Sequence, residues 1–315
     1  MTVSGVEQLD HGIHAIDTRT GGLSSVTAGY LIAAPRPTLI ECGPALSIET
    51  VLDALRELGM DPGDLAHLVV SHVHLDHAGG AGNVAESFPS ARVVVSERGA
   101  RHLVDPERLN TSARRVYGEL MDTVYGDCTR VPQDRVWGVA DGDVLELGGG
   151  RSLELLYTPG HAKHHISALD SDSGALFVGD SVGVRMPGMT AVRPATPPPD
   201  FDLELAERTL QRYRQLQPAA VLLTHYGPLQ PPMPSLEEAS RRLRLWADTA
   251  EQAWREHSEL DHVAETLARR FADDVDPDTP DPEVVERARL MNNPRSNAMG
   301  FVRYFQQRQE DKAAT

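Results

Sequence analysis

The chain has 315 residues, of which 40% are hydrophobic, so it can bury a sizeable core and extended disorder is excluded. Its formal net charge of -16 argues against nucleic acid and anionic membranes as partners, because binding to phosphate groups needs clustered Lys and Arg side chains. The chain has only two cysteines, which excludes a framework of disulfides. Residues 1–7 lack the pattern of a secretion signal, and no apolar run approaches the roughly 20 residues that span a bilayer. We therefore expect a cytoplasmic protein.

The first part of the chain alternates between strand and helix patterns. Ser47 precedes apolar residues at helical spacing and Gly59 follows the last of them, which predicts a helix over residues 48–58. Residues 107–125 also show helical spacing, which is consistent with a lid or wall of a site and equally with another packed helix. Strands are predicted over residues 13–16, 26–33, 38–41, 68–71 and 92–95, and short helices over residues 82–87 and 98–104.

The second part of the chain repeats the pattern and then becomes helical. Strands are predicted over residues 153–157, 165–169, 175–178 and 221–224, with a hairpin connection at 170–174. Asp202 is a candidate cap for a helix that reaches Gln217, and Ser235 with Glu238 has the form of a capping box. We expect a linker or exposed loop at residues 273–283, and a last helix at 297–307.

This change of character predicts two parts. Residues 1–234 are expected to form a catalytic domain, and residues 235–315 a C-terminal helical extension packed on its core. Three roles are open for the extension: packing against the core, closing the site, or forming the contact of a homodimer.

Chemistry-bearing side chains are concentrated in the segment that follows the predicted strand 68–71. In an extended segment, side chains two residues apart point the same way, so His72 and His74 can face one ion. Asp76 and His77 come where the strand gives way to a loop, and Gly79-Gly80 permits a sharp turn. Three imidazoles and a carboxylate within six residues indicate a metal site.

Three more candidate ligands stand at or just beyond the ends of later apolar strands. They are His161 in Thr158-Pro159-Gly160-His161, Asp180 after Val178-Gly179, and His225 after Thr224. Loops at strand ends allow a rigid sheet to hold ligands from distant parts of the chain close together. The joint occurrence of these residues with the first cluster strengthens the prediction of a metal site.

With these motifs the sequence resembles the metallo-β-lactamase fold superfamily over roughly residues 10 to 230. The signature H-x-H-x-D-H matches residues 72–77, and T-P-G-H, V-G-D and T-H follow in the family's order at 158–161, 178–180 and 224–225. The resemblance implies an α/β fold, a four-layer αββα sandwich, here followed by the C-terminal helical extension. Glu41-Cys42-Gly43 stands where many members have Asp-Thr-Gly.

The resemblance also implies a ligand set for two ions. His72, His74 and His161 would bind the first, Asp76, His77 and His225 the second, and Asp180 would bridge them. Five imidazoles and two carboxylates without a thiolate suit two Zn²⁺, with Mn²⁺, Fe²⁺ or Co²⁺ as alternatives. Asp76 is in addition a candidate catalytic proton carrier.

The expected function is a binuclear metal-dependent hydrolase in which a metal-bound hydroxide attacks an ester, thioester or lactone carbonyl of a small-molecule substrate. The bridging Asp180 resembles the glyoxalase II-like and lactonase-like branches. Alternatives are a mono-iron persulfide dioxygenase-like enzyme, a thioesterase or cyclase acting on a carrier-bound intermediate, a phosphodiesterase, and a non-catalytic module of the same fold. The roles of His164, His165, Tyr226 and Glu41 are open at this point.

Overall fold

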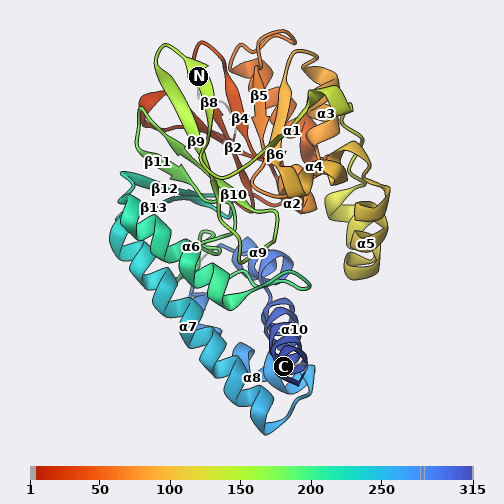
Figure 1. Cartoon of the computed structure of the whole chain (residues 1–315), viewed down its shortest axis with the longest axis vertical. Coiled ribbons are helices and arrows are strands. Elements are labelled where there is room, and N and C mark those ends of the chain that lie inside the picture. The colour runs from red at the N-terminus through yellow and green to blue at the C-terminus, as the bar shows by residue number, and fades with distance from the viewer. Residues whose placement is uncertain (1–4, 277, 280, 314–315) are drawn as a thin grey trace. The chain divides into compact units, whose positions relative to one another are not determined.

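The computed structural model describes residues 5–276, 278–279 and 281–313. The chain forms two compact units (Figure 1). The first consists of Met1–Tyr157, His164–Gly179 and Ala219–Pro228, and the second of Thr158–Lys163, Asp180–Pro218 and Leu229–Thr315. Both β sheets belong to the first unit, except that the last residue of strand β13 lies in the second.

The first sheet has seven strands in the order β1 to β7. Neighbouring strands are antiparallel from β1 to β4 and parallel from β4 to β7. Buried apolar runs such as Val93-Val94-Val95 are typical of parallel strands that are covered on both faces. The strands are β1 (Val6–Gln8), β2 (Ile13–Asp17), β3 (Ala28–Ile32), β4 (Thr38–Ile40), β5 (His67–Val69), β6 (Arg92–Ser96) and β7 (Val136–Val139).

Helices connect the parallel strands of this sheet, as parallel pairing requires. Helix α1 buries Val51, Leu52 and Leu55, which confirms the apolar stripe predicted after Ser47. Residues 107–125 form a helix followed by a single π-helical turn at Met121–Tyr125. The helices of this unit are α1 (Ile48–Glu57), α2 (Leu75–Ala78), α3 (Ala81–Ser87), α4 (Glu97–Val104) and α5 (Glu107–Tyr117).

The second sheet has six strands in the order β13-β12-β11-β10-β9-β8. Strands β11 and β12 are parallel, whereas β8 to β11 pair antiparallel. The predicted connection at residues 170–174 does join a hairpin, β10 to β11. The strands are β8 (Asp143–Gly148), β9 (Arg151–Tyr157), β10 (Ile166–Asp170), β11 (Ala175–Phe177), β12 (Ala220–Leu223) and β13 (Gly227–Leu229).

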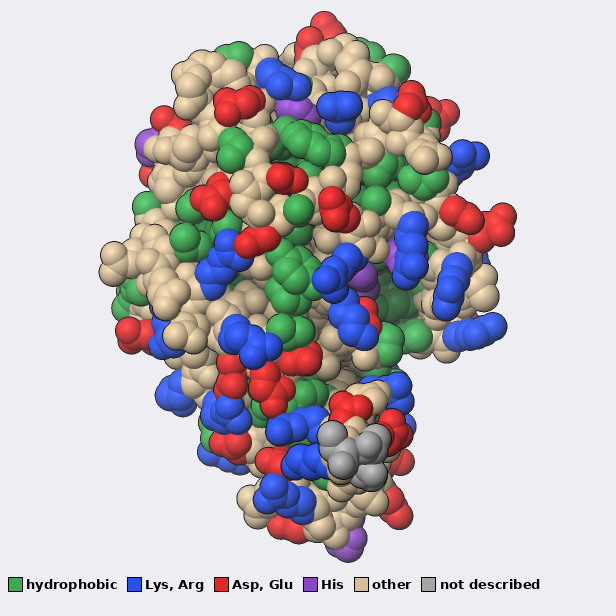
Figure 2. Space-filling view, viewed as in Figure 1, with side chains coloured by type: hydrophobic (Ala, Val, Ile, Leu, Met, Phe, Trp, Pro, Cys, Tyr) green, Lys and Arg blue, Asp and Glu red, His purple; other side chains and the backbone are tan. Residues whose placement is uncertain are grey.

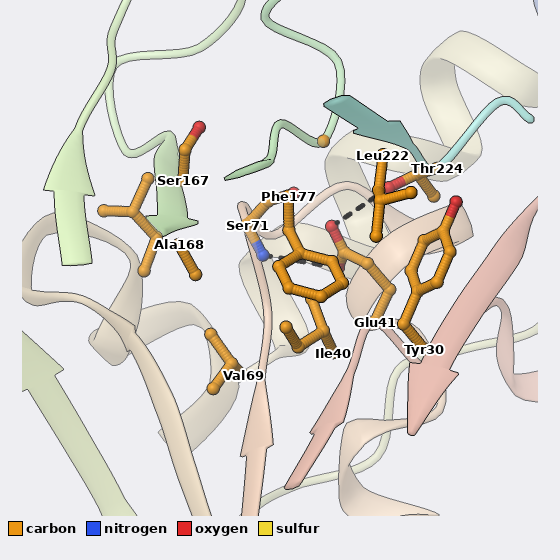
Figure 3. Close-up of a pocket in the computed structure, with 12 residues that line it drawn as sticks. Tyr30, Ile40, Glu41, Val69, Ser71, Ser167, Ala168, Phe177, Leu222 and Thr224 are labelled. Atoms are coloured by element: carbon orange, nitrogen blue, oxygen red, sulfur yellow. Dashed lines mark hydrogen bonds between the residues drawn. The ribbon is translucent and has the colours of Figure 1, made fainter. Parts of the chain in front are cut away.

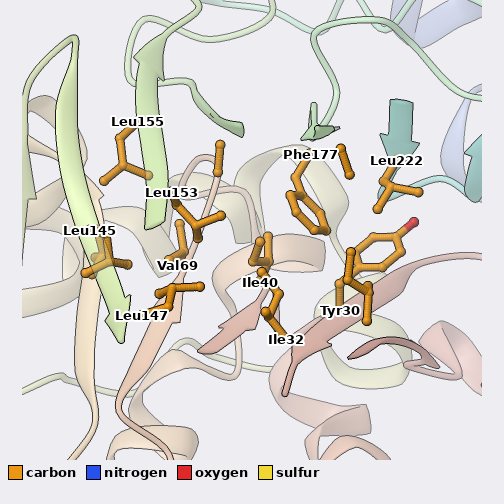
Figure 4. Packing of buried hydrophobic residues seen from close by; sticks show 14 of the residues in the cluster. Tyr30, Ile32, Ile40, Val69, Leu145, Leu147, Leu153, Leu155, Phe177 and Leu222 are labelled. Atoms are coloured by element: carbon orange, nitrogen blue, oxygen red, sulfur yellow. The ribbon is translucent and has the colours of Figure 1, made fainter. Parts of the chain in front are cut away.

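A hydrophobic core fills the space between the two sheets (Figure 4). Ile40 and Val69 of the first sheet and Leu153 and Leu155 of the second belong to it, and the rings of Tyr30 and Phe177 meet edge to face at 5.4 Å. Residues that alternate along the strands point into this layer, as expected for packed sheets. The packing holds the two sheets together and so fixes the ends of β5 and β12.

The second unit is helical in the part of the chain that the structure describes. Helix α6 begins after Asp202, whose carboxylate accepts a hydrogen bond from the Leu205 N–H at 2.9 Å, which confirms the predicted cap. Trp246 stacks on Phe271 with ring centroids 4.3 Å apart. The helices are α6 (Leu203–Leu216), α7 (Pro232–Glu256), α8 (Leu260–Arg270), α9 (Glu283–Met291) and α10 (Pro294–Ala313).

The capping box predicted at Ser235 is wrong. Helix α7 begins at Pro232, and the buried Ser235 lies within its first turn. Proline at the first helical position has no N–H to satisfy and a preset φ, so it begins the helix earlier.

In the predicted loop at 273–283, Asp274 is buried between Arg193 and Arg242, and residues 277 and 280 lie outside the described part of the chain.

The boundary predicted between residues 1–234 and 235–315 stays a prediction. Across the described ranges, no helix combines the length and the hydropathy that a membrane crossing would require.

A buried histidine at the start of β5 provides a test of the fold. The Arg36 Nη2 donates to His67 Nε2 at 3.0 Å, which leaves His67 Nδ1–H to donate to Thr38 Oγ1 at 3.1 Å. Burial, with the positive charges of Arg36 and Arg92, lowers the pKa of His67 to about 4. The fold therefore binds the neutral imidazole.

We predict that the stability lost in His67→Gln depends on pH. The folded pKa lies below the unfolded value of about 6.5, so the contribution of His67 is fully present above pH 6.5 and is lost as the pH falls towards 4. Urea unfolding should give the wild type a higher free energy of unfolding than His67→Gln at pH 7. This difference in free energy should be smaller by on the order of 2 kcal/mol at pH 4.5. An equal difference at both pH values would contradict the buried neutral state.

Candidate metal centre

The segment from His72 to His77 directly follows the end of β5. His72 and His77 are fully buried, and Asp76 and His77 lie in the single turn of α2. The chain then turns at Gly79, where a Cβ atom would stand 2.3 Å from the Leu75 carbonyl oxygen. Only glycine allows this close approach, so the sharp turn predicted at Gly79-Gly80 requires glycine at position 79.

Five of the seven predicted ligands belong to the first unit, and their side chains converge. His72 Nε2 lies 2.9 Å from His74 Nδ1. Asp76 Oδ2 lies 3.3 Å from His225 Nε2 and 3.7 Å from His77 Nε2. Asp76, His77 and His225 each offer one ligand atom, and these atoms lie within 4.8 Å of one another. Such a cluster is suited to binding a divalent ion.

Two of these imidazoles are oriented through the nitrogen that faces away from the cluster. His225 Nδ1 lies 2.8 Å from the Val26 carbonyl oxygen, and His77 Nδ1 lies 3.2 Å from Glu41 Oε1. A carbonyl oxygen only accepts, so His225 Nδ1 carries the proton and Nε2 retains its lone pair. This second hydrogen bond is usual for metal-binding histidines.

The second unit contains the other two predicted ligands, His161 and Asp180. The His161 ring is oriented by a hydrogen bond of its outer nitrogen, as the other two imidazoles are. His161 Nδ1 donates to the Ala195 carbonyl oxygen at 3.0 Å, and its Nε2 lies 3.6 Å from Asp180 Oδ2. Both residues are buried. Gly160 precedes them at a point where a Cβ atom would be 2.4 Å from Ala206 Cα in helix α6, so this glycine lets the loop pack on the helix.

Glu41 lies at the edge of a small cavity between the sheets (Figure 3). Its Oε2 accepts from the Ser71 N–H at 3.3 Å, and its Oε1 accepts from Thr224 Oγ1 at 3.4 Å. Its φ of 60° is in the left-handed region, which is uncommon for a residue with a side chain. The surrounding contacts hold this carboxylate towards His77.

Cys42 follows Glu41 and is also buried. Burial, with the nearby charge of Glu41, raises the pKa of the Cys42 thiol well above its usual value. The thiol donates to the His77 carbonyl oxygen at 3.3 Å. Cys42 is therefore a protonated packing residue, in agreement with a donor set that lacks a thiolate.

Three of the residues whose roles the sequence left open lie at different places. The His165 ring is stacked 5.2 Å from the His72 ring, and the His164 ring is 6.1 Å from the His74 ring. Tyr226 packs against the core between the sheets. Sequence reasoning did not single out Tyr125, which is buried in the π-helical turn and whose pKa is raised by burial and by the charge of Asp76.

The sequence model of the metallo-beta-lactamase superfamily matches residues 24–225. The metallo-beta-lactamase fold-containing protein ST1585 of Sulfurisphaera tokodaii is 31% identical over 226 residues, which are 70% of this chain and 80% of that protein. The crystal structure of the archaeal ST1585 matches with a TM-score of 0.62 and 28% identity, and covers 76% of this chain and 87% of that one.

Two enzymes match over shorter stretches. A hydroxyacylglutathione hydrolase of a Synechococcus species is 31% identical over 154 residues, 49% of this chain and 48% of the enzyme. The N-acyl homoserine lactonase AttM of Rhizobium radiobacter is 29% identical over 124 residues, 38% of this chain and 40% of the enzyme. The chain thus spans less than half of the length of either enzyme.

The matches confirm the predicted αββα type of fold, in which two mixed sheets are combined with helices and further helices follow at the C-terminal end. The family match extends from the second predicted strand to His225 and so includes all seven predicted ligand positions. The chain therefore belongs to the metallo-beta-lactamase superfamily, most of whose members are metal-dependent hydrolases.

Proposed function

We propose that this protein is a binuclear metal-dependent hydrolase that cleaves an ester, thioester or lactone bond in a small molecule. The observation that carries the proposal is the convergence of Asp76, His77 and His225, with the outer nitrogens of both imidazoles held by hydrogen bonds. The partial similarity to a hydroxyacylglutathione hydrolase and to a lactonase supports the choice of bond.

The proposed ligand set is the one that the sequence predicts, and the donor types fit zinc. His72, His74 and His161 bind one ion; Asp76, His77 and His225 bind the other; Asp180 is shared. In support, the outer nitrogens of His77, His161 and His225 all point to oxygen acceptors, which leaves Nε2 of each for a metal. Neutral imidazoles and carboxylates are the donors that Zn²⁺ prefers where thiolates are absent.

Two bound divalent ions would lower the pKa of a shared water and polarise the substrate carbonyl. The protein itself contributes orientation and proton transfer. Glu41 keeps His77 in the tautomer that presents Nε2, and the Val26 carbonyl does the same for His225. Asp76 Oδ2, between those two imidazoles, is placed to accept a proton from the attacking water and to return it to the leaving group.

We also propose a cytoplasmic location. Both cysteines of the chain are buried free thiols, which is consistent with a reducing compartment.

Removal of a proposed ligand should reduce both metal binding and turnover. We expect His74→Ala and Asp180→Ala each to reduce bound metal and to lower kcat/KM by at least about 100-fold, because each loses a proposed metal ligand. Elemental analysis and a screen of lactone, thioester, phosphodiester and sulfate-ester substrates measure both quantities. His164→Ala should retain the metal, and the exposed His257→Ala serves as a matched control with unchanged metal and rate.

Three results would defeat this proposal. Wild-type activity in metal-free protein would exclude metal-dependent hydrolysis. One iron per chain, together with oxygen consumption, would favour the dioxygenase alternative. Loss of metal in His164→Ala would mean that the ligands are assigned wrongly.

Glu41 should affect the binding of one ion rather than both, because its carboxylate contacts His77, which is a proposed ligand of the second ion only. We expect Glu41→Ala to weaken the affinity for one of two Zn²⁺ by roughly 10- to 100-fold, and Glu41→Gln to weaken it less. Competition with a chromophoric chelator measures the two affinities separately.

The matched control is Glu49→Gln, which removes an exposed carboxylate from helix α1 and should leave both affinities unchanged. If Glu41→Ala bound two Zn²⁺ as tightly as the wild type, the carboxylate would have no positioning role.

A further inference from the structure

We propose that helix α4 presents an anion-binding subsite, formed by Arg98 and Arg101 beside His102, which selects substrates that carry a carboxylate or phosphate group. The inference rests on the proposed hydrolase function and names the class of its substrate. All residues in it belong to the first unit.

The local charge of this region is opposite to that of the whole chain. The chain has a formal net charge of -16, yet residues 98–115 contain five arginines and only two acidic residues. Figure 2 shows Lys and Arg side chains gathered at the right edge, over helices α4 and α5. On an acidic protein, a basic face attracts anions, whereas the remaining acidic surface repels them.

The two guanidinium groups on α4 keep their charge available. Arg98 lies over the Tyr157 ring at 5.0 Å, and Arg101 Nε donates to His102 Nε2 at 3.3 Å. In the described ranges, neither takes part in an ion pair, whereas Arg114 on α5 pairs with two aspartates at 2.9 and 3.0 Å. Both Arg98 and Arg101 are exposed, so an incoming anion can reach them.

This face is connected to the metal-binding cluster by direct packing. Gly99, between the two arginines, abuts the cluster: a Cβ atom there would be 3.1 Å from Val73 Cγ1 and 3.6 Å from His164 Cβ. The ring centroids of His102 and His164 are 6.3 Å apart, and those of His164 and His74 are 6.1 Å apart. Two ring contacts therefore lead from His74 to the residue that Arg101 contacts.

The chemistry of these groups defines the ligand. Guanidinium presents a fork of N–H donors that matches the two oxygens of a carboxylate or phosphate. Arg101 contacts His102, and two ring contacts connect His102 to His74, so the anionic group of the substrate would bind next to the metal-binding cluster. The substrate is therefore an anionic ester, thioester or lactone rather than a neutral one.

The test compares two esters of one phenol in Arg98→Gln/Arg101→Gln. We expect KM for the 4-nitrophenyl hemisuccinate to rise roughly tenfold at 0.15 M salt, while KM for 4-nitrophenyl acetate, kcat and bound metal stay within twofold of the wild type. The control is Arg108→Gln/Arg115→Gln, which removes the same charge from exposed positions of α5 and should change neither KM by more than twofold.

Equal KM values for wild type and double variant, or an equal rise for both esters, would overturn the inference.

Titration calorimetry of the metal-loaded protein with glutarate, glycerol 1-phosphate and neutral glutaramide gives a readout that does not depend on turnover. Binding of either anion that weakens about tenfold in the double variant supports the subsite even if neither ester is hydrolysed, in which case only the hydrolase proposal fails. Anions that bind no better than glutaramide would contradict the subsite, and the two anions distinguish a carboxylate from a phosphate preference.

Discussion

Metal-binding histidines almost always donate their other ring N–H to a hydrogen-bond acceptor, and the rest of this site depends on that requirement. His77 meets it with the Glu41 carboxylate, His225 with the Val26 carbonyl oxygen and His161 with the Ala195 carbonyl oxygen. Each acceptor fixes both the tautomer and the direction of Nε2. The fold therefore brings these three acceptors to the outer nitrogens of the imidazoles.

The sheets achieve this through their buried strands. His72 and His77 follow β5 and His225 follows β12, two strands whose apolar side chains are buried in the packed sheets. The same layer contains the Glu41 carboxylate, which is tolerated in the interior because Ser71, Thr224 and His77 surround it with hydrogen-bonding groups. The left-handed backbone at Glu41 brings its side chain to this position.

Much of this arrangement could be predicted from local sequence. The strand before His72, the hairpin at 170–174 and the Asp202 cap are local patterns, and the structure contains all three. The capping box at Ser235 failed because Pro232 is a stronger start signal three residues earlier. Strands β7 and β8 were not predicted: Gly138 interrupts the pattern of β7, which pairs with the distant β6, and Gly142 directly precedes β8, which pairs with the neighbouring β9.

The parts of the site that sequence could not predict are those made by backbone and by long-range contact. A carbonyl oxygen such as those of Val26 and Ala195 is available at nearly every residue, so no residue type marks the acceptor of a histidine. The approach of His102 to His164 is likewise a product of tertiary packing around Gly99. Chemistry-bearing motifs were thus predictable, whereas the groups that orient them were not.

The proposed ligand assignment has seven residues that bind two ions, with Asp180 shared. The most direct measurement is a zinc-edge anomalous difference map from crystals of the zinc-loaded protein. We expect two peaks, each about 2.0–2.2 Å from its proposed imidazole and carboxylate ligands, with Asp180 in contact with both. A single peak, or two peaks with Asp180 bound to neither, would contradict it.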